Sequence, residues 1–298
     1  MKKLTAVLLA LCMAATCFAA CSKEGKSTDD SAATPPLAIT YDATYGSFDP
    51  SVYSAYETLC NAIFSGETSA RFNIGLMEDV LQLYYTSFPL QPLADVTENE
   101  DGSGALITYH EDTEAVKEHI SAFAEKINAL KTECYAGTVS KTVYTLNLYR
   151  YICESYTEGD AENVYETVMN GNGNSETYTR LFEYLLQQAD IPAYHIIAAD
   201  ERGATTPMTE AELDGQLYYF DVATERMLNG GKALRYFGMT TDDLATDMVV
   251  STMYTNMAAS SYASDLRFDS CRTSVAWEIS GASLLVTMEN GTVAEIEL

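Results

Sequence analysis

The feature that most constrains the fold is a helix-forming stretch placed between an Asn-Gly loop and a run of alternating strands. The stretch NGNGNSETYTRLFEYLLQQADIPAY spans residues 170–194, and its helical segment covers about residues 175–189. Pro192 ends that segment, because proline disfavours the helical conformation in the residue before it. AYHIIAAD then alternates like a strand, and EAELDGQLYYFDVA predicts a hairpin that turns at Asp214-Gly215. We expect an α+β protein in which this helix packs on an antiparallel sheet.

The part of the chain before this stretch is predicted to be mainly helical. Residues 51–87 have helical character, ALITYH at 105–110 alternates like a strand, and 111–134 forms an amphipathic helix. The apolar stripe of that last helix consists of Val116, Ile120, Phe123, Ile127 and Leu130. We therefore expect residues 38–135 to form a mainly helical N-terminal region. Residues 136–298 form a second domain, with a loop at 201–207, a short capped helix in GMTTDDLATDM and strands at its end.

The first 20 residues read as a signal peptide. Lys2 and Lys3 supply a positive start, and residues 4–15 form an apolar run shorter than the roughly 20 residues that a membrane-spanning helix needs. FAAC at 18–21 resembles the lipobox of bacterial lipoproteins, in which the signal peptide is cut before a cysteine that then receives lipid. The resemblance implies acyl chains such as palmitate on Cys21, which hold a protein at a membrane when two or more are present. The alternative is ordinary secretion, with Cys21 left as a free thiol.

Residues 21–37 are predicted to be the lipidated cysteine and a flexible tether, because they carry too little apolar surface to fold. Removal of the two lysines in residues 1–20 leaves 15 Lys and Arg against 43 Asp and Glu, a net charge of −28. Such a surface repels nucleic acid and anionic headgroups, so we expect no nucleic-acid partner. The expected partner is the cell membrane, reached through the lipid on Cys21, with the protein facing outside the cytoplasm.

Four further cysteines follow Cys21, at Cys60, Cys134, Cys153 and Cys271. They allow two disulfides in three connectivities, and the sequence does not choose among these. No CxxC pair occurs, so the spacing indicates neither a zinc site nor a redox motif. We expect no cofactor and no metal.

The segment order of residues 137–250 resembles that of transglutaminase-like domains, which share the papain-like cysteine core. NGNGNSETYTRLFEYLLQQADIPAY is similar to the family's loop, nucleophile and helix, usually N-G-x-x-x-C-E-G-Y. TPMTEAELDGQLYYFDVATE is similar to H-A-W-N-x-V-x-L-D-G-x-W-Y-x-x-D-x-T-W-D, and LRYFGMTTDDL is similar to the tail after the core. The resemblance implies a thiolate at a helix N-terminus, a histidine base on a following strand and an aspartate that orients the imidazole.

Two of the three catalytic positions carry other residues in this sequence. The motif places Ser175 at the cysteine, Thr206 at the histidine and Asp221 at the aspartate, on a strand. No histidine occurs from residue 196 to residue 298, and the only one in the region is His195. A serine hydroxyl needs a base, because the dipole of a helix cannot lower its high pKa enough. Ser175 fits an ordinary helix N-cap, and we expect a vestigial, inactive triad.

We therefore expect an inactive transglutaminase-like module that binds a peptide, a protein or the cell wall in the cleft between helix and sheet. The alternative is an active amide hydrolase or acyltransferase that uses Ser175 with Asp221, and with His195 as the base. A third interpretation is an acidic α+β lipoprotein of another fold. The positions of Ser175, His195, Thr206 and Asp221 separate these alternatives.

Overall fold

The structure is a computed structural model that describes residues 37–41, 48–135, 137, 140–246, 248–250 and 261–298. The predicted signal peptide, Cys21 and the tether up to residue 36 lie outside the described residues. Leu37 was counted in the tether, but it is 8% exposed and packs in the main core, so it belongs to the packed domain. Within the described ranges, no helix has both the length and the apolar character needed to cross a membrane.

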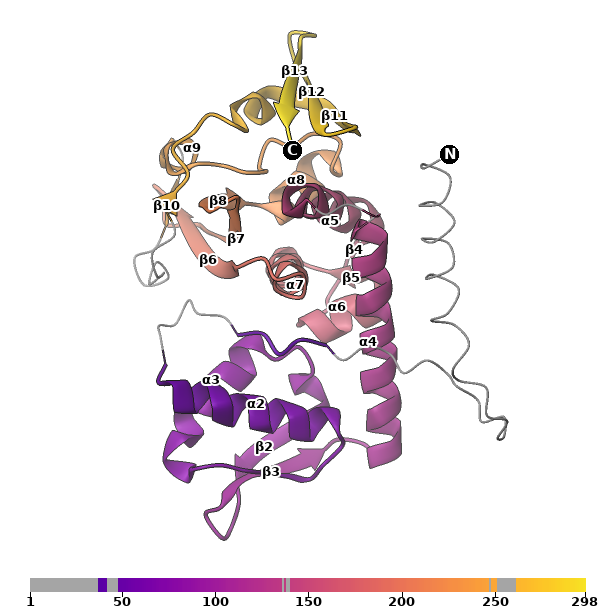
Figure 1. The fold of residues 1–298 in the computed structure, drawn as a ribbon, viewed down its shortest axis with the longest axis vertical. Coiled ribbons are helices and arrows are strands. Elements are labelled where there is room, and N and C mark those ends of the chain that lie inside the picture. Colours follow the sequence, from indigo (N-terminus) through magenta and orange to yellow (C-terminus); the bar gives the residue numbers. More distant parts are fainter. Residues whose placement is uncertain (1–36, 42–47, 136, 138–139, 247, 251–260) are drawn as a thin grey trace, which may run out of the picture. The chain divides into compact units, whose positions relative to one another are not determined.

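The N-terminal region combines helices with a small sheet (Figure 1). Its helices are α2 (Pro50–Phe64), α3 (Met77–Ser87) and α4 (Thr113–Tyr135), with a 3-10 turn at Ile74–Leu76 before α3 and another at Gln91–Leu93. An antiparallel sheet of order β1-β3-β2 contains β1 (Ser69–Arg71), β2 (Ala94–Glu98) and β3 (Gly104–Tyr109). The stripe predicted for α4 is buried along its whole length, because these side chains share one face of the helix. The prediction of a mainly helical region is confirmed, although β1 and β2 were missed.

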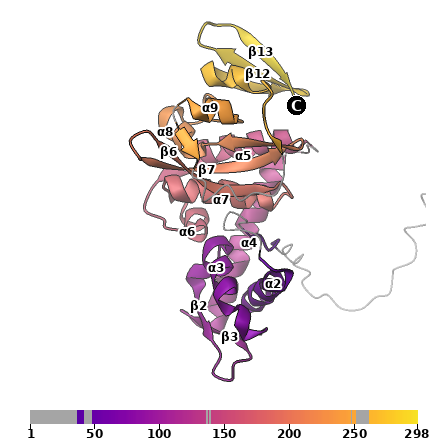
Figure 2. The same cartoon turned by 90° about the vertical axis from the view of Figure 1, so that its left-hand side faces the viewer.

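The predicted second domain lies in the same compact unit as the N-terminal region and shares its main core. It is built around α7 (Ser175–Gln187), which packs on β6 and β7 of a five-stranded sheet (Figure 2). The order of this sheet is β10-β8-β7-β6-β9, and every neighbouring pair is antiparallel except β10 with β8. Its strands are β6 (Ala193–Asp200), β7 (Thr205–Leu213), β8 (Gln216–Phe220), β9 (Met248–Val250) and β10 (Ser261–Tyr262). The predicted α+β class, with a helix packed on an antiparallel sheet, is confirmed.

The hairpin between β7 and β8 turns at Asp214-Gly215, as the sequence predicts. The two residues have φ angles of 53° and 82°, which is the left-handed pair that a two-residue hairpin turn requires. Glycine adopts this conformation without strain, and aspartate is among the few other residues that tolerate it. The loop predicted at 201–207 is shorter than expected, because β7 already begins at Thr205.

Four further helices belong to this domain: α5 (Lys141–Ser155), α6 (Val164–Asn170), α8 (Val222–Asn229) and α9 (Thr241–Ala245). Helices α5, α6 and α8 pack against α7, and α4 packs against α5 and α6. Two short strands, β4 (Thr157–Glu158) and β5 (Asn172–Gly173), pair in parallel just before α7. Helix α8 was not predicted, and its N-cap is Asp221, so placing Asp221 on a strand was wrong.

The chain ends in a separate antiparallel sheet of order β11-β12-β13, preceded by a 3-10 turn at Asp269–Thr273. Its strands are β11 (Ser274–Ser280), β12 (Ser283–Met288) and β13 (Val293–Glu297). These are the strands expected at the end of the chain, where TSVAWEIS and SLLVTMENGTVAEIEL alternate and the second segment turns at Asn290-Gly291.

Two clusters of buried side chains pack on opposite faces of β6, β7 and β8. The main core contains residues of α7 together with Ala193, Ala211 and Phe220 from the strands. A second, smaller core consists of Ile196, Ala198, Met208, Tyr219, Met239 and Leu244. Alternation of side chains along a strand explains this division, because successive residues point to opposite faces.

The side chain of Gln188, the residue after α7, binds the backbone of Ala38 near the start of the packed domain. Its side-chain amide accepts a hydrogen bond from the N–H of Ala38 at 3.0 Å and donates one to the carbonyl of Ala38 at 2.7 Å. Gln188 is 5% exposed, whereas Ala38 is exposed, so both bonds are partly buried. One amide side chain therefore satisfies both backbone groups of Ala38.

All four described cysteines are free thiols, and each is buried. None of the three possible disulfide connectivities is formed among Cys60, Cys134, Cys153 and Cys271. Burial raises the pKa of all four thiols, to about 12 for Cys134 and Cys271. Buried thiols of high pKa are inert, so these four cysteines serve as small apolar side chains.

Candidate functional site

Helix α7 follows the loop that was expected to hold a nucleophile. Its N-cap is Asn174 and not Ser175. The Asn174 side chain accepts a hydrogen bond from the N–H of Thr177 at 3.2 Å, and the N–H of Asn174 donates to the Thr177 hydroxyl at 2.9 Å. Such reciprocal bonds satisfy donors that the helix leaves open. The prediction that Ser175 is the N-cap is therefore wrong. Ser175 is the first helical residue, exposed, and its carbonyl accepts a hydrogen bond from the Thr179 hydroxyl.

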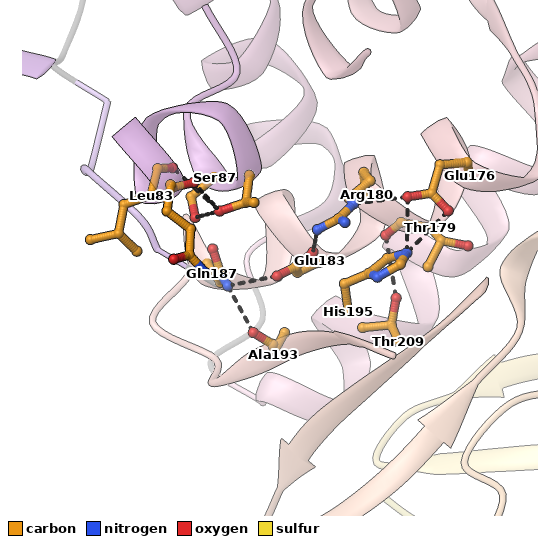
Figure 3. A network of polar contacts seen from close by, with 12 residues as sticks. Leu83, Ser87, Glu176, Thr179, Arg180, Glu183, Gln187, Ala193, His195 and Thr209 are labelled. Carbon is orange, nitrogen blue, oxygen red and sulfur yellow. Dashed lines mark hydrogen bonds and ion pairs between the residues drawn. The ribbon is translucent and has the colours of Figure 1, made fainter. Parts of the chain in front are cut away.

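His195, the only histidine of residues 136–298, lies on β6 and contacts the residue that follows Ser175. Its Nε2 lies 3.1 Å and 3.2 Å from the two carboxylate oxygens of Glu176 (Figure 3). The imidazole is 3% exposed, whereas 48% of the Glu176 side chain remains exposed. The structure therefore joins β6 to the first turn of α7 through an imidazole and a carboxylate.

Glu176 is held in its charged form. Burial by itself would raise its pKa, but the hydrogen bond and charge of His195, followed by those of Arg180, lower the pKa to about 2. A negative charge in the first turn of a helix also interacts favourably with the helix dipole. The Nε2 of His195 therefore faces a permanent anion at neutral pH.

A row of polar contacts continues from this pair along α7 (Figure 3). The Arg180 Nε lies 3.1 Å from Glu176, and its Nη1 lies 3.8 Å from Glu183. The side-chain amide of Gln187 donates to Glu183 at 3.2 Å and to the carbonyl of Ala193 at 2.7 Å. Residues three and four apart are neighbours on a helix surface, which places all four side chains on one face of α7.

Thr206, at the motif's histidine position, lies on the face of the sheet that is turned away from α7. It is half-buried and pairs in register with Ala198, which belongs to the second core. On the opposite face of the same strand, the Thr209 hydroxyl donates to the Thr179 carbonyl on α7 at 3.3 Å. Side chains alternate along β7, so Thr206 points away from the helix that carries Ser175.

Asp221, at the motif's aspartate position, is used to cap α8. It is 0% exposed, and its Oδ1 accepts the N–H of Thr224 at 2.8 Å. Its Oδ2 is buried and has no hydrogen-bond partner in the described part of the chain. Burial raises the pKa of this carboxyl group, which favours its neutral form. Among the described residues, no hydrogen bond connects Asp221 to Ser175 or to Thr206.

A cavity of about 250 Å³ lies beside the N-terminal half of α7. Glu176, Thr177 and Arg180 form its α7 side, Tyr85 to Gln91 contribute a second side, and Glu162 to Val164 contribute a third. We call this cavity the α7 groove. Tyr85 is 56% exposed, so an aromatic ring is available there for contact with a ligand. A larger cavity of about 360 Å³ lies at the other end of α7, away from Ser175.

The described residues include no group of three or more His, Cys, Asp or Glu side chains that could hold a metal ion. The sequence expectation of no metal and no cofactor stays a prediction.

No model of a known protein family matches the sequence, and no curated protein matches it. Three solved structures resemble parts of it at low identity. A candidate protease from Parabacteroides distasonis is 15% identical with a TM-score of 0.28, over 42% of this chain and 29% of the other. A TGase is 11% identical with a TM-score of 0.29, over 44% of each chain. A candidate cysteine protease from Cytophaga hutchinsonii is 14% identical with a TM-score of 0.29, over 47% of each chain. This chain therefore spans less than half the length of any of the three.

The pairing of His195 with Glu176 was missed by sequence reasoning. Glu176 follows the expected nucleophile directly and matches the glutamate of the motif N-G-x-x-x-C-E-G-Y. The two residues are 19 positions apart, and the packing of α7 on β6 brings them together. The one signal available was a glutamate in the first turn of a helix followed by a single histidine on the next strand.

Proposed function

We propose that this chain is an extracytoplasmic protein anchored by lipid on Cys21, whose second domain is a transglutaminase-like module that binds a ligand without catalysing acyl transfer. The observation that carries the loss of catalysis is the engagement of His195 Nε2 by both oxygens of Glu176. A hydroxyl nucleophile needs a base within hydrogen-bond reach, and among the described residues no hydrogen bond joins Ser175 to His195, whose Nε2 is directed at Glu176.

Two further observations support the proposal. Thr206, which replaces the motif's histidine, points to the face of the sheet turned away from α7. Asp221 has one carboxylate oxygen bound to the first turn of α8 and the other buried without a described partner. In an active triad that second oxygen would accept the N–H of an imidazole. Capping of α8 by Asp221 therefore supports a structural role for this residue.

The α7 groove is the site we propose for the ligand, which is a peptide, a protein or the cell wall. The groove adjoins Ser175 through Glu176 and Thr177, and it combines charged side chains with the exposed ring of Tyr85. Ligand sites commonly combine an aromatic or apolar surface with a few polar groups that fix orientation. No residue of the sheet lines this groove, so the proposed site differs from the cleft between helix and sheet that the sequence predicts.

A serine-reactive probe tests the loss of catalysis directly. We expect a fluorophosphonate to leave the protein unlabelled, and we expect no release of amine from a panel of peptide amides. Labelling at Ser175 that disappears in Ser175→Ala, together with turnover that falls at least about a hundredfold in His195→Ala, would establish an active hydrolase instead.

Binding is tested with isolated cell-wall sacculi in a co-sedimentation assay. We expect the protein to sediment with the sacculi and Tyr85→Ala to reduce the bound fraction severalfold. Tyr135→Ala is the matched control, because Tyr135 is 47% exposed and does not line the groove. Equal loss of binding in the two variants would remove the groove from the proposal.

The membrane anchor is tested by growing expressing cells with labelled palmitate. We expect the label in the protein and the protein in the membrane fraction, with both lost in Cys21→Ser. Secretion of unlabelled protein that keeps Cys21 as a thiol would support ordinary secretion.

A further inference from the structure

Glu210 is a carboxylate buried at the centre of the five-stranded sheet. It lies on β7, the middle strand, opposite Tyr194 on β6 and Tyr219 on β8. Alternation along β7 puts it on the same face as Met208, which is the face of the second core. Only 1% of Glu210 is exposed, so its side chain is removed from water. Fully buried glutamates are rare in proteins unless another group pairs with them.

Glu210 lacks such a partner. Both of its carboxylate oxygens are buried, and neither makes a hydrogen bond within the described part of the chain. The Tyr219 hydroxyl lies close enough to favour the charged form, but its geometry is not that of a hydrogen bond. Leaving a buried carboxylate unpaired is costly only while it is charged, because protonation removes most of that cost.

Among the described residues, no Lys or Arg side chain packs in the second core around Glu210. The described titratable side chains on this face are Tyr194, Tyr219, Tyr236 and Tyr262, together with Glu212 two residues along β7. The ring of Tyr262 lies 6.2 Å from that of Tyr219. The acids of α9 are directed elsewhere, since Asp243 accepts hydrogen bonds from Thr240 and Asp242 is exposed. Burial raises the pKa of Glu210 to about 7, against a weaker opposing effect of Tyr219.

We propose that ionisation of Glu210 is a built-in switch that releases α9 from the second core and β10 from the edge of the sheet beside β8. Both elements are short. Helix α9 has five residues, and β10 has two that pair only with Gln216 and Leu217 of β8. Short elements with few contacts open at lower free energy than central strands. Lifting them lets water reach the carboxylate while β6, β7 and β8 stay paired.

The pH range of the switch follows from the direction of the pKa change. The pKa of Glu210 is higher in the folded protein than its ordinary value of 4.5, so the closed state is fully stable below that pH. Its stability falls as the pH rises to about 7 and is constant above that. The opening equilibrium therefore increases roughly tenfold per pH unit over this interval, because one pKa unit corresponds to a tenfold change.

Hydrogen exchange measured by mass spectrometry on the whole secreted chain tests the switch between pH 5 and pH 8. After correction for intrinsic exchange, we expect protection of residues 239–246 and 261–266 to fall by well over tenfold from pH 5 to pH 7. Protection should not fall further at pH 8. Glu210→Gln should keep its protection throughout. Glu278→Gln, an exposed strand glutamate in another sheet, should behave like the unsubstituted protein.

Two results would overturn the proposal. One is protection in the unsubstituted protein that does not change with pH. The other is the same pH dependence in Glu210→Gln as in the unsubstituted protein. If Glu210→Gln does not fold, infrared spectroscopy of the unsubstituted protein replaces it, because a buried protonated carboxyl has a distinct C=O band. That band should disappear near pH 7 together with the protection, and its absence at pH 5 would end the proposal. This test does not depend on what the α7 groove binds.

Discussion

The Nε2 of His195 lies within 3.2 Å of both carboxylate oxygens of Glu176, the residue that follows Ser175 on α7. A buried imidazole on the sheet is thus held by the first turn of the helix that packs on it. The same contact keeps Glu176 charged and engages the one histidine that could serve Ser175 as a base. This pair connects the stability of the domain to the absence of catalysis that we propose.

Glu176→Gln should destabilise the protein in a manner that depends on pH. The pKa of Glu176 is lowered to about 2 in the folded state, so its contribution is present above its ordinary value of 4.5 and is lost as the pH falls towards 2. The side chain is 48% exposed, which limits the expected loss at pH 7 to about 1 kcal/mol. Urea unfolding at pH 7 and pH 3 measures both effects, with Glu278→Gln as the exposed control. An equal loss at the two pH values would contradict the role given to the carboxylate.

Asn174→Ala and Ser175→Ala should differ although the residues are adjacent. Asn174 accepts the N–H of Thr177 and caps α7, so its loss should cost about 1 kcal/mol. Ser175 is exposed at the first helical position, and its replacement by the better helix former should change stability by less than about 0.5 kcal/mol. Thermal or chemical unfolding of the two variants gives the comparison. A larger effect at Ser175 would restore it as the cap.

Asp221→Asn should be tolerated and should stabilise the protein at neutral pH. Asparagine keeps the oxygen that accepts the Thr224 N–H and removes a buried acid. Burial raises the pKa of Asp221 in the folded state, so its ionisation costs stability as the pH rises above its ordinary value of 3.8. The gain from Asp221→Asn should therefore disappear in acid. Asp221→Ala loses the cap and should be destabilised by about 1 kcal/mol in acid, where the carboxyl group is neutral in both states. Its destabilisation should be smaller at neutral pH, because alanine also removes the buried acid.

The four thiols of the packed domain should be inert until it unfolds. In a chain that starts at residue 22, Cys60, Cys134, Cys153 and Cys271 are all buried and free. We expect a thiol reagent such as DTNB to react with none of them in buffer and with all four in concentrated urea, with no reducing agent needed. Fewer than four reactive thiols in urea would indicate a disulfide.

The boundaries of α7 and β6 were predictable because asparagine, glycine and proline residues, which end helices and strands, flank them. An Asn-Gly loop precedes α7, and Pro192 separates it from β6, so the helix ended two residues before the expected position and the strand matched. Strands β9 and β10 have three and two residues, which is too short for any alternation to be recognised. Strand β9 forms by pairing with β6, and strand β10 forms by pairing with β8. The sequence does not show which strands have a free edge, because this depends on the order of strands in the folded sheet.

Helix α8 was missed although its sequence carried both end signals. Asp221 supplies the N-cap, and Gly230 ends the helix in the left-handed conformation at φ 64°. The similarity of this segment to the transglutaminase motif favoured a strand that carries a catalytic aspartate, and that interpretation hid the cap. The pairing of His195 with Glu176 and the isolation of Glu210 were beyond sequence analysis, because each depends on which strands are neighbours and which face a helix covers.

The two hydrogen bonds between Gln188 and Ala38 also have a mechanical consequence. If Cys21 is fixed in a membrane, tension on the protein enters the packed domain through Leu37 and Ala38 and reaches this amide first. Both bonds join the same pair of residues, so a pull along the chain loads them together. In an anchored chain, Gln188 would thus pass a pull on Ala38 to the end of α7.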